Sequence, residues 1–113
     1  MSGPLLRVGL AVRAYGGTKP NRPGVVLRVH EIGGEWFAFV AFGTSQVPPG
    51  GSTPAPILID RGHPAFAPLA LDTPTWFKAR GGGRLRDDDP SIRVVGECPP
   101  QTLLLLRGLF GFR

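Results

Sequence analysis

Residues 24–42, GVVLRVHEIGGEWFAFVAF, decide the fold because they predict two strands joined by a tight turn. Gly24–Glu31 alternates with the two-residue period of a half-buried strand. One face carries Val26, Arg28 and His30, and the other carries Val25, Leu27 and Val29. Glu35–Phe42 is aromatic and β-branched with no polar face, so we expect a strand buried on both sides. Gly33-Gly34 favours a hairpin between them.

This hairpin would bring together two segments that lie about 20 residues apart in the chain. Lys19-Pro20-Asn21-Arg22-Pro23 enters the first strand, and Ala41-Phe42-Gly43-Thr44-Ser45-Gln46 leaves the second. Antiparallel pairing places the Arg22 guanidinium and the hydroxyls of Thr44 and Ser45 at one rim of the sheet. A fixed cation beside two hydroxyls can bind a phosphodiester.

The rest of the chain predicts further short strands separated by turns. We expect strands at residues 5–14, 57–60, 75–80 and 92–95, a short helical turn at 63–71 and a terminal helix at 101–110. Loops are expected at residues 15–21, 43–56 and 81–90. Short apolar blocks bounded by 17 Gly and 13 Pro residues are typical of a small all-β domain, here a single domain over residues 1–113.

Composition limits the class of protein. The formal charge of +5 and the pI near 10.7 favour polyanions such as nucleic acid as partners. One cysteine excludes an internal disulfide and suits a reducing compartment. The longest apolar run, residues 36–42, is too short to span a bilayer, so we expect a cytoplasmic protein without membrane contact. One Cys and two His in no recognisable spacing predict no metal site, and we expect no cofactor.

Each candidate site residue also has a purely structural interpretation. Arg22 can hold a phosphate in two-point fashion, or it can simply belong to the turn that Pro23 fixes. Thr44 and Ser45 can polarise a phosphate oxygen, or their hydroxyls can bond their own backbone. Arg7, Arg13, Lys19 and Arg28 can add to the positive field, or some of them can belong to solvated strand faces. The residues alone leave these alternatives open.

Three motifs in a fixed order resemble the PemK/MazF family of toxins from toxin–antitoxin pairs. They are KPNRPGVVLRV, AFGTSQ and the segment ILID…HPAF…LALDTPTWFKA, together covering roughly residues 5–80. The resemblance implies an SH3-like β-barrel with a short helix after the middle strands and a C-terminal helix, usually a homodimer. It also implies cleavage of single-stranded RNA without metal, in which the 2′-hydroxyl attacks the adjacent phosphate, and an antitoxin partner with an acidic disordered segment. In this picture Arg22 and Thr44 are the catalytic residues.

The chain departs from the family pattern in three places. Val8-Gly9-Leu10 stands where a Gly-Asp pair is usual, Asn21 precedes Arg22 where a basic residue is common, and residues 81–89 match poorly.

Two functions are therefore expected from this sequence. The first is an endoribonuclease toxin in which Lys19, Ser45, Gln46 and Arg28 bind the RNA substrate. The second is a non-catalytic SH3-like binding module, of phage or regulatory type, that uses the same basic rim to hold a protein or nucleic acid.

Overall fold

The computed structural model describes residues 3–112, and its central feature is the predicted hairpin. Strand β2 spans Lys19–Ile32, strand β3 spans Glu35–Thr44, and the two pair antiparallel. Gly33 and Gly34 form the turn with φ of 60° and 84°. Glycine adopts these left-handed values without a Cβ clash, and a turn of this kind follows the natural twist of the strands. The hairpin prediction is confirmed.

A β-bulge at Leu27 interrupts the alternation predicted for β2. The register with β3 shifts between Val26 and Arg28, which leaves Leu27 as the extra residue. Val25, Val26 and Leu27 are all fully buried. Beyond the bulge, Val29 packs on the same side as Val26, opposite to the face predicted for it. The predicted alternation is therefore correct before Leu27 and wrong after it, because a bulge reverses which side chains face each core.

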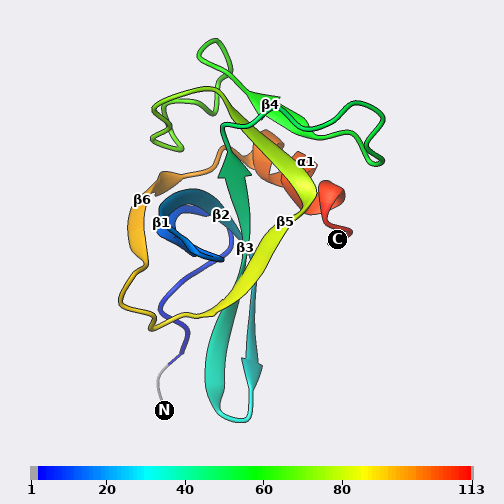
Figure 1. Cartoon of the computed structure of the whole chain (residues 1–113). Helices are drawn as coiled ribbons and strands as arrows, with labels where there is room; N and C mark the ends of the chain where they lie inside the picture. The colour runs from blue at the N-terminus through cyan, green and yellow to red at the C-terminus, as the bar shows by residue number, and fades with distance from the viewer. Residues whose placement is uncertain (1–2, 113) are drawn as a thin grey trace.

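Six antiparallel strands form one sheet that curls into a half-barrel, in the order β4-β5-β3-β2-β1-β6 (Figure 1). The remaining strands are β1 (Leu10–Gly16), β4 (Ile57–Ile59), β5 (Thr75–Arg86) and β6 (Arg93–Glu97). With 46% strand against 9% helix, the prediction of a mainly β protein is confirmed.

The sheet carries a hydrophobic core on each face. Helix α1 (Pro100–Leu109) covers one face, where Leu106 is fully buried, and its position confirms the predicted terminal helix (Figure 1). On the other face, Leu6 of the N-terminal segment packs into the second core with Val40. Strand β3 contributes Ala41 to the first core and Val40 to the second, so the expected burial on both sides holds for its second half, while Trp36 and Phe37 near its start are only half-buried. Within residues 3–112, no helix has the length and apolar character needed to cross a bilayer.

Strand β1 differs from the strand predicted at residues 5–14. Gly9 has φ of 99°, and the Leu10 N–H donates to the Arg7 carbonyl in a turn, so the strand begins only at Leu10. Its other end extends further than predicted. Because β1 continues to Gly16 and β2 begins at Lys19, the loop predicted at residues 15–21 is reduced to a tight connection.

The loop predicted at residues 81–90 is wrong over its first part, since β5 continues through three glycines to Arg86. The Phe39 ring of β3 lies in the space that a Cβ on Gly82 would occupy. A ring from the neighbouring strand therefore packs over the glycine and compensates for its missing side chain.

The helical turn predicted at residues 63–71 is present only as a single α-type turn, and the short helix that the resemblance implies after the middle strands does not form. Successive turns run through this segment. One α-type bond is present, from the Leu69 N–H to the Ala65 carbonyl at 3.0 Å. Pro64 and Pro68 have no N–H to donate, and Ala70 takes a left-handed φ of 54°, so the pattern does not propagate.

Candidate functional site

A hollow of about 220 Å³ lies where the start of β2 meets the end of β3. Its walls include Lys19 and Arg22 from β2, Thr44 from β3 and Ser45 just beyond it. The structure thus brings the Arg22 cation and both hydroxyls to one rim, as the hairpin register predicted. Their chemical roles stay predictions.

The Arg22 side chain is held from two sides. Its Nη2 donates a hydrogen bond of 3.0 Å to the Gly43 carbonyl, and its guanidinium lies 5.4 Å from the centre of the Phe42 ring. Gly16 of β1 leaves room for this arrangement, because a Cβ at that position would lie 2.8 Å from Arg22 Cδ. The cation is therefore fixed at the wall of the hollow.

The Arg22 charge is not neutralised by a neighbouring carboxylate within residues 3–112. Burial lowers the pKa of this half-buried guanidinium, because desolvation disfavours its charged form. An arginine nevertheless stays protonated in proteins. A partly desolvated cation without a counter-ion favours an anionic ligand, since electrostatic attraction is stronger where water is excluded.

The two hydroxyls differ in their surroundings. Thr44 is half-buried, and its Oγ1 accepts the Gln46 backbone N–H at 3.2 Å. The hydroxyl of Thr44 therefore bonds the nearby backbone, as the structural interpretation of this residue predicts. Because the oxygen acts only as an acceptor in this bond, the hydroxyl proton can still be donated to a ligand. Ser45 is exposed at the rim.

The remaining predicted substrate-binding residues divide into two groups. Lys19 is exposed and lines the hollow. Gln46 does not line the hollow. Arg28 lies six residues beyond Arg22 along β2, which places it roughly 20 Å from Arg22 at the usual rise of a strand. Arg28 instead lies over the Phe112 ring, with 6.0 Å between guanidinium and ring centre. The structure does not bring Arg28 or the Gln46 side chain to the site.

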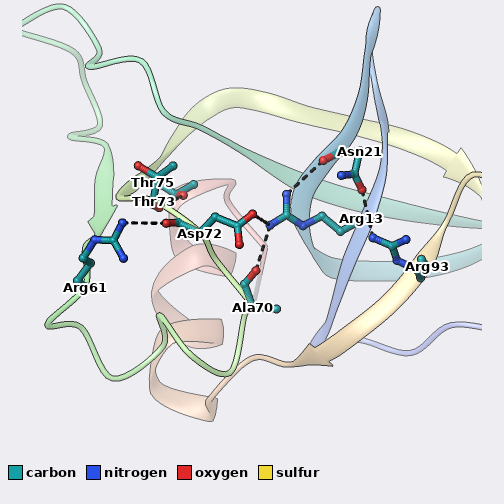
Figure 2. Close-up of polar contacts among 8 residues, drawn as sticks. All are labelled: Arg13, Asn21, Arg61, Ala70, Asp72, Thr73, Thr75 and Arg93. Carbon is teal, nitrogen blue, oxygen red and sulfur yellow. Dashed lines mark hydrogen bonds and ion pairs between the residues drawn. The ribbon is translucent and has the colours of Figure 1, made fainter.

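The hollow is also lined by Arg13, which the sequence named only as a possible contributor to the positive field, and by Asp72, to which it gave no role (Figure 2). Arg13 of β1 pairs with Pro23, the residue that follows Arg22 in β2, while Arg22 itself pairs with Ala14. Arg13 Nη2 reaches Asp72 Oδ2 at 3.4 Å. Asp72 stands within the third motif of the resemblance, which gave it no role, and it comes from a turn segment nearly 60 residues after Arg13.

The other reactive side chains have structural surroundings. Cys98 is buried, and burial raises the pKa of its thiol to about 12. His63 Nδ1 accepts the Ala65 N–H at 3.0 Å within the turn segment. No group of three or more His, Cys, Asp or Glu residues among the described part of the chain is placed to hold a metal ion.

Comparisons with protein-family models, with curated proteins and with solved structures found no match to this chain. The likeness to the PemK/MazF family therefore stays a resemblance in short motifs.

Proposed function

We propose that this protein is a metal-independent endoribonuclease that binds a phosphodiester of single-stranded RNA in the hollow beside Arg22. One observation carries the proposal. Arg22 is a fixed, half-buried cation without an acidic partner in residues 3–112, and it lies at the wall of a hollow that also presents the hydroxyl groups of Thr44 and Ser45. Such a group holds a phosphate and stabilises the charge that develops on it.

The proposed reaction is attack of a ribose 2′-oxygen on its own 3′-phosphorus. The O2′–P bond forms as the P–O5′ bond breaks, which leaves a 2′,3′-cyclic phosphate and a 5′-hydroxyl. Asp72 is the sole carboxylate among the described residues that line the hollow, so it is the candidate acceptor of the 2′-hydroxyl proton. The 5′-oxygen takes a proton from water or from the acid so formed. Arg22 and the Thr44 hydroxyl stabilise the crowded phosphorane more than the substrate, which is the condition for acceleration.

The resemblance to the PemK/MazF family also suggests a fold type, an oligomeric state and a partner for this protein. It suggests an SH3-like barrel of the PemK/MazF type, a homodimer, and a toxin whose cognate antitoxin covers the hollow. The formal charge of +5 would suit an antitoxin segment that is acidic.

The decisive experiment incubates the purified protein with single-stranded RNA in EDTA. We expect cleavage products that end in a cyclic phosphate and a 5′-hydroxyl, and no cleavage of DNA of the same sequence, which lacks the attacking hydroxyl. Arg22→Ala should lower kcat/KM by about 10²–10³-fold, the usual cost of removing one group that stabilises transition-state charge. Arg84→Ala is the matched control, because its guanidinium lies 5.1 Å from the Phe37 ring centre and outside the hollow. RNA that stays intact at saturating protein would contradict catalysis.

The second candidate function is a non-catalytic SH3-like binding module. The bond from the Gln46 N–H to Thr44 Oγ1 favours it, since this hydroxyl already has a local structural role. For the ribonuclease, and for a module that holds nucleic acid, RNA affinity should fall as salt rises, with a log–log slope of about −0.7 for each phosphate contact. Salt-sensitive binding without cleavage supports the module. RNA affinity that does not change with salt argues against a nucleic-acid site altogether.

A further inference from the structure

Of the two non-glycine residues with a left-handed backbone in residues 3–112, one lines the hollow and the other directly precedes Leu71, which lines it. They are Asn21, with φ of 55°, and Ala70, with φ of 54°. Asn21 directly precedes Arg22, and Ala70 comes two residues before Asp72. Asparagine tolerates this conformation better than most L-residues, whereas alanine adopts it only when its surroundings enforce it, and strained positions of this kind cluster at functional sites.

One guanidinium binds the carbonyls of both left-handed residues. Arg13 Nη1 donates to the Asn21 carbonyl at 3.2 Å, and Arg13 Nη2 donates to the Ala70 carbonyl at 3.0 Å (Figure 2). The same Nη2 also reaches Asp72 Oδ2 at 3.4 Å. Arg13 therefore joins the wall that carries Arg22 to the wall that carries Asp72.

Arg13 is poorly placed to bind the substrate itself. Its side chain is only 14% exposed, and both terminal nitrogens already donate to protein oxygens. This contrasts with Arg22, which makes one protein hydrogen bond and no ion pair within the described residues. The rigid fork of a guanidinium suits the bridging of two fixed carbonyls, which an ammonium cannot reproduce with the same geometry.

We propose that Arg13 is a positioning residue that clamps the backbone at the two left-handed residues, Asn21 and Ala70, and thereby aims Arg22 and Asp72 into the hollow. Arg93 also holds Asn21, because its Nη2 donates a hydrogen bond to Asn21 Oδ1 at 3.4 Å. The test of this inference by RNA cleavage rests on the proposed ribonuclease function. Its test by the NMR resonance of Arg22 does not depend on that function.

The first test compares Arg13→Met with Arg84→Met, a control that removes the same charge outside the hollow. We expect Arg13→Met to broaden or shift the Arg22 Nε–H resonance in ¹H–¹⁵N spectra recorded without RNA, and the control to leave it unchanged. In RNA cleavage, kcat/KM should fall about 10–100-fold, mainly through kcat, because displacing a reacting group by about 1 Å costs up to 10²-fold. The salt slope of RNA binding should match that of Arg84→Met.

The second test is rescue by glycine. Glycine adopts a positive φ at no steric cost, so Asn21→Gly and Ala70→Gly should keep the left-handed backbone at both positions without the hydrogen bonds from Arg13. In the Arg13→Met background they should restore the Arg22 resonance and recover part of the lost kcat/KM. A role limited to the ion pair with Asp72 predicts no rescue. If Arg13→Met does not fold, Arg13→Lys replaces it, and the same shift and rescue are expected.

Three results would overturn the inference. They are an unchanged Arg22 resonance in Arg13→Met, a lack of rescue by the glycines, and a salt slope about one phosphate contact smaller than that of the control, which would place Arg13 on the substrate. If the wild-type protein cuts no RNA, the proposed function fails, and the resonance with its glycine rescue still decides the role of Arg13.

Discussion

Gly16→Ala gives the sharpest test of how Arg22 is positioned. The new Cβ would lie 2.8 Å from Arg22 Cδ and 3.1 Å from two Phe42 ring atoms. Carbon atoms prefer about 3.5–4.0 Å, so a neighbour must move by roughly 0.7 Å or more. Phe42 is 4% exposed and confined by the core, whereas Arg22 is half-buried and can swing outward.

From this geometry we expect two effects of Gly16→Ala. The free energy of unfolding should fall by about 1–3 kcal/mol, the range for overpacking a well-packed site. In the ribonuclease assay kcat/KM should fall about 10–100-fold, because Arg22 loses its place over Phe42. Urea unfolding and cleavage of an RNA oligonucleotide in EDTA measure the two quantities. Gly50→Ala is the matched control, since its Cβ would meet nothing within 4 Å.

A double-mutant cycle with Arg22→Ala identifies the clashing partner. If Arg22 is the group that yields, the stability cost of Gly16→Ala shrinks when the Arg22 side chain is absent. An undiminished cost would place the clash on Phe42 alone. A Gly16→Ala protein that matches Gly50→Ala in both stability and cleavage would refute the proposed confinement of Arg22.

Three further predictions concern the fold. At pH 8 the Cys98 thiol, with a pKa near 12, should react with a disulfide reagent about 10³-fold more slowly in the native than in the unfolded protein, and rapid native labelling would contradict its burial. A hydrogen bond and the positive charge from Arg7 lower the pKa of Glu97. The Arg7–Glu97 pair therefore stabilises the fold at pH values above the ordinary carboxyl pKa, and this contribution is lost as the pH falls through the lowered pKa of Glu97. Arg7→Met should return the Glu97 pKa toward its usual value in an NMR titration, and an unchanged titration would exclude the pair. Arg107→Met removes the 2.9 Å bond to the Leu27 carbonyl at the bulge, and should lower unfolding free energy by about 1–3 kcal/mol in urea, whereas an unchanged midpoint would mean that water replaces the bond.

The sequence predicted only those site residues that belong to, or directly follow, the β2–β3 hairpin. Arg22, Thr44 and Ser45 follow from the pairing of two adjacent strands, so sequence distance and strand period suffice to bring them together. Arg28 could have been excluded from the site in the same way, since it lies six residues beyond Arg22, and only the bulge was not visible in the sequence. Its place along β2 puts it far from the hollow, and the bulge at Leu27 changes the face on which it lies.

The sequence by itself determined the hairpin of β2 and β3, the terminal helix and the mainly β class, because each follows from local periodicity or turn chemistry. The tertiary structure alone decided that β5 runs on through its glycines, because the Phe39 ring packs over Gly82. It alone also brought Asp72 to Arg13 across 59 residues of chain. Contacts of this kind depend on how a curled sheet places distant segments side by side, and no local pattern encodes that.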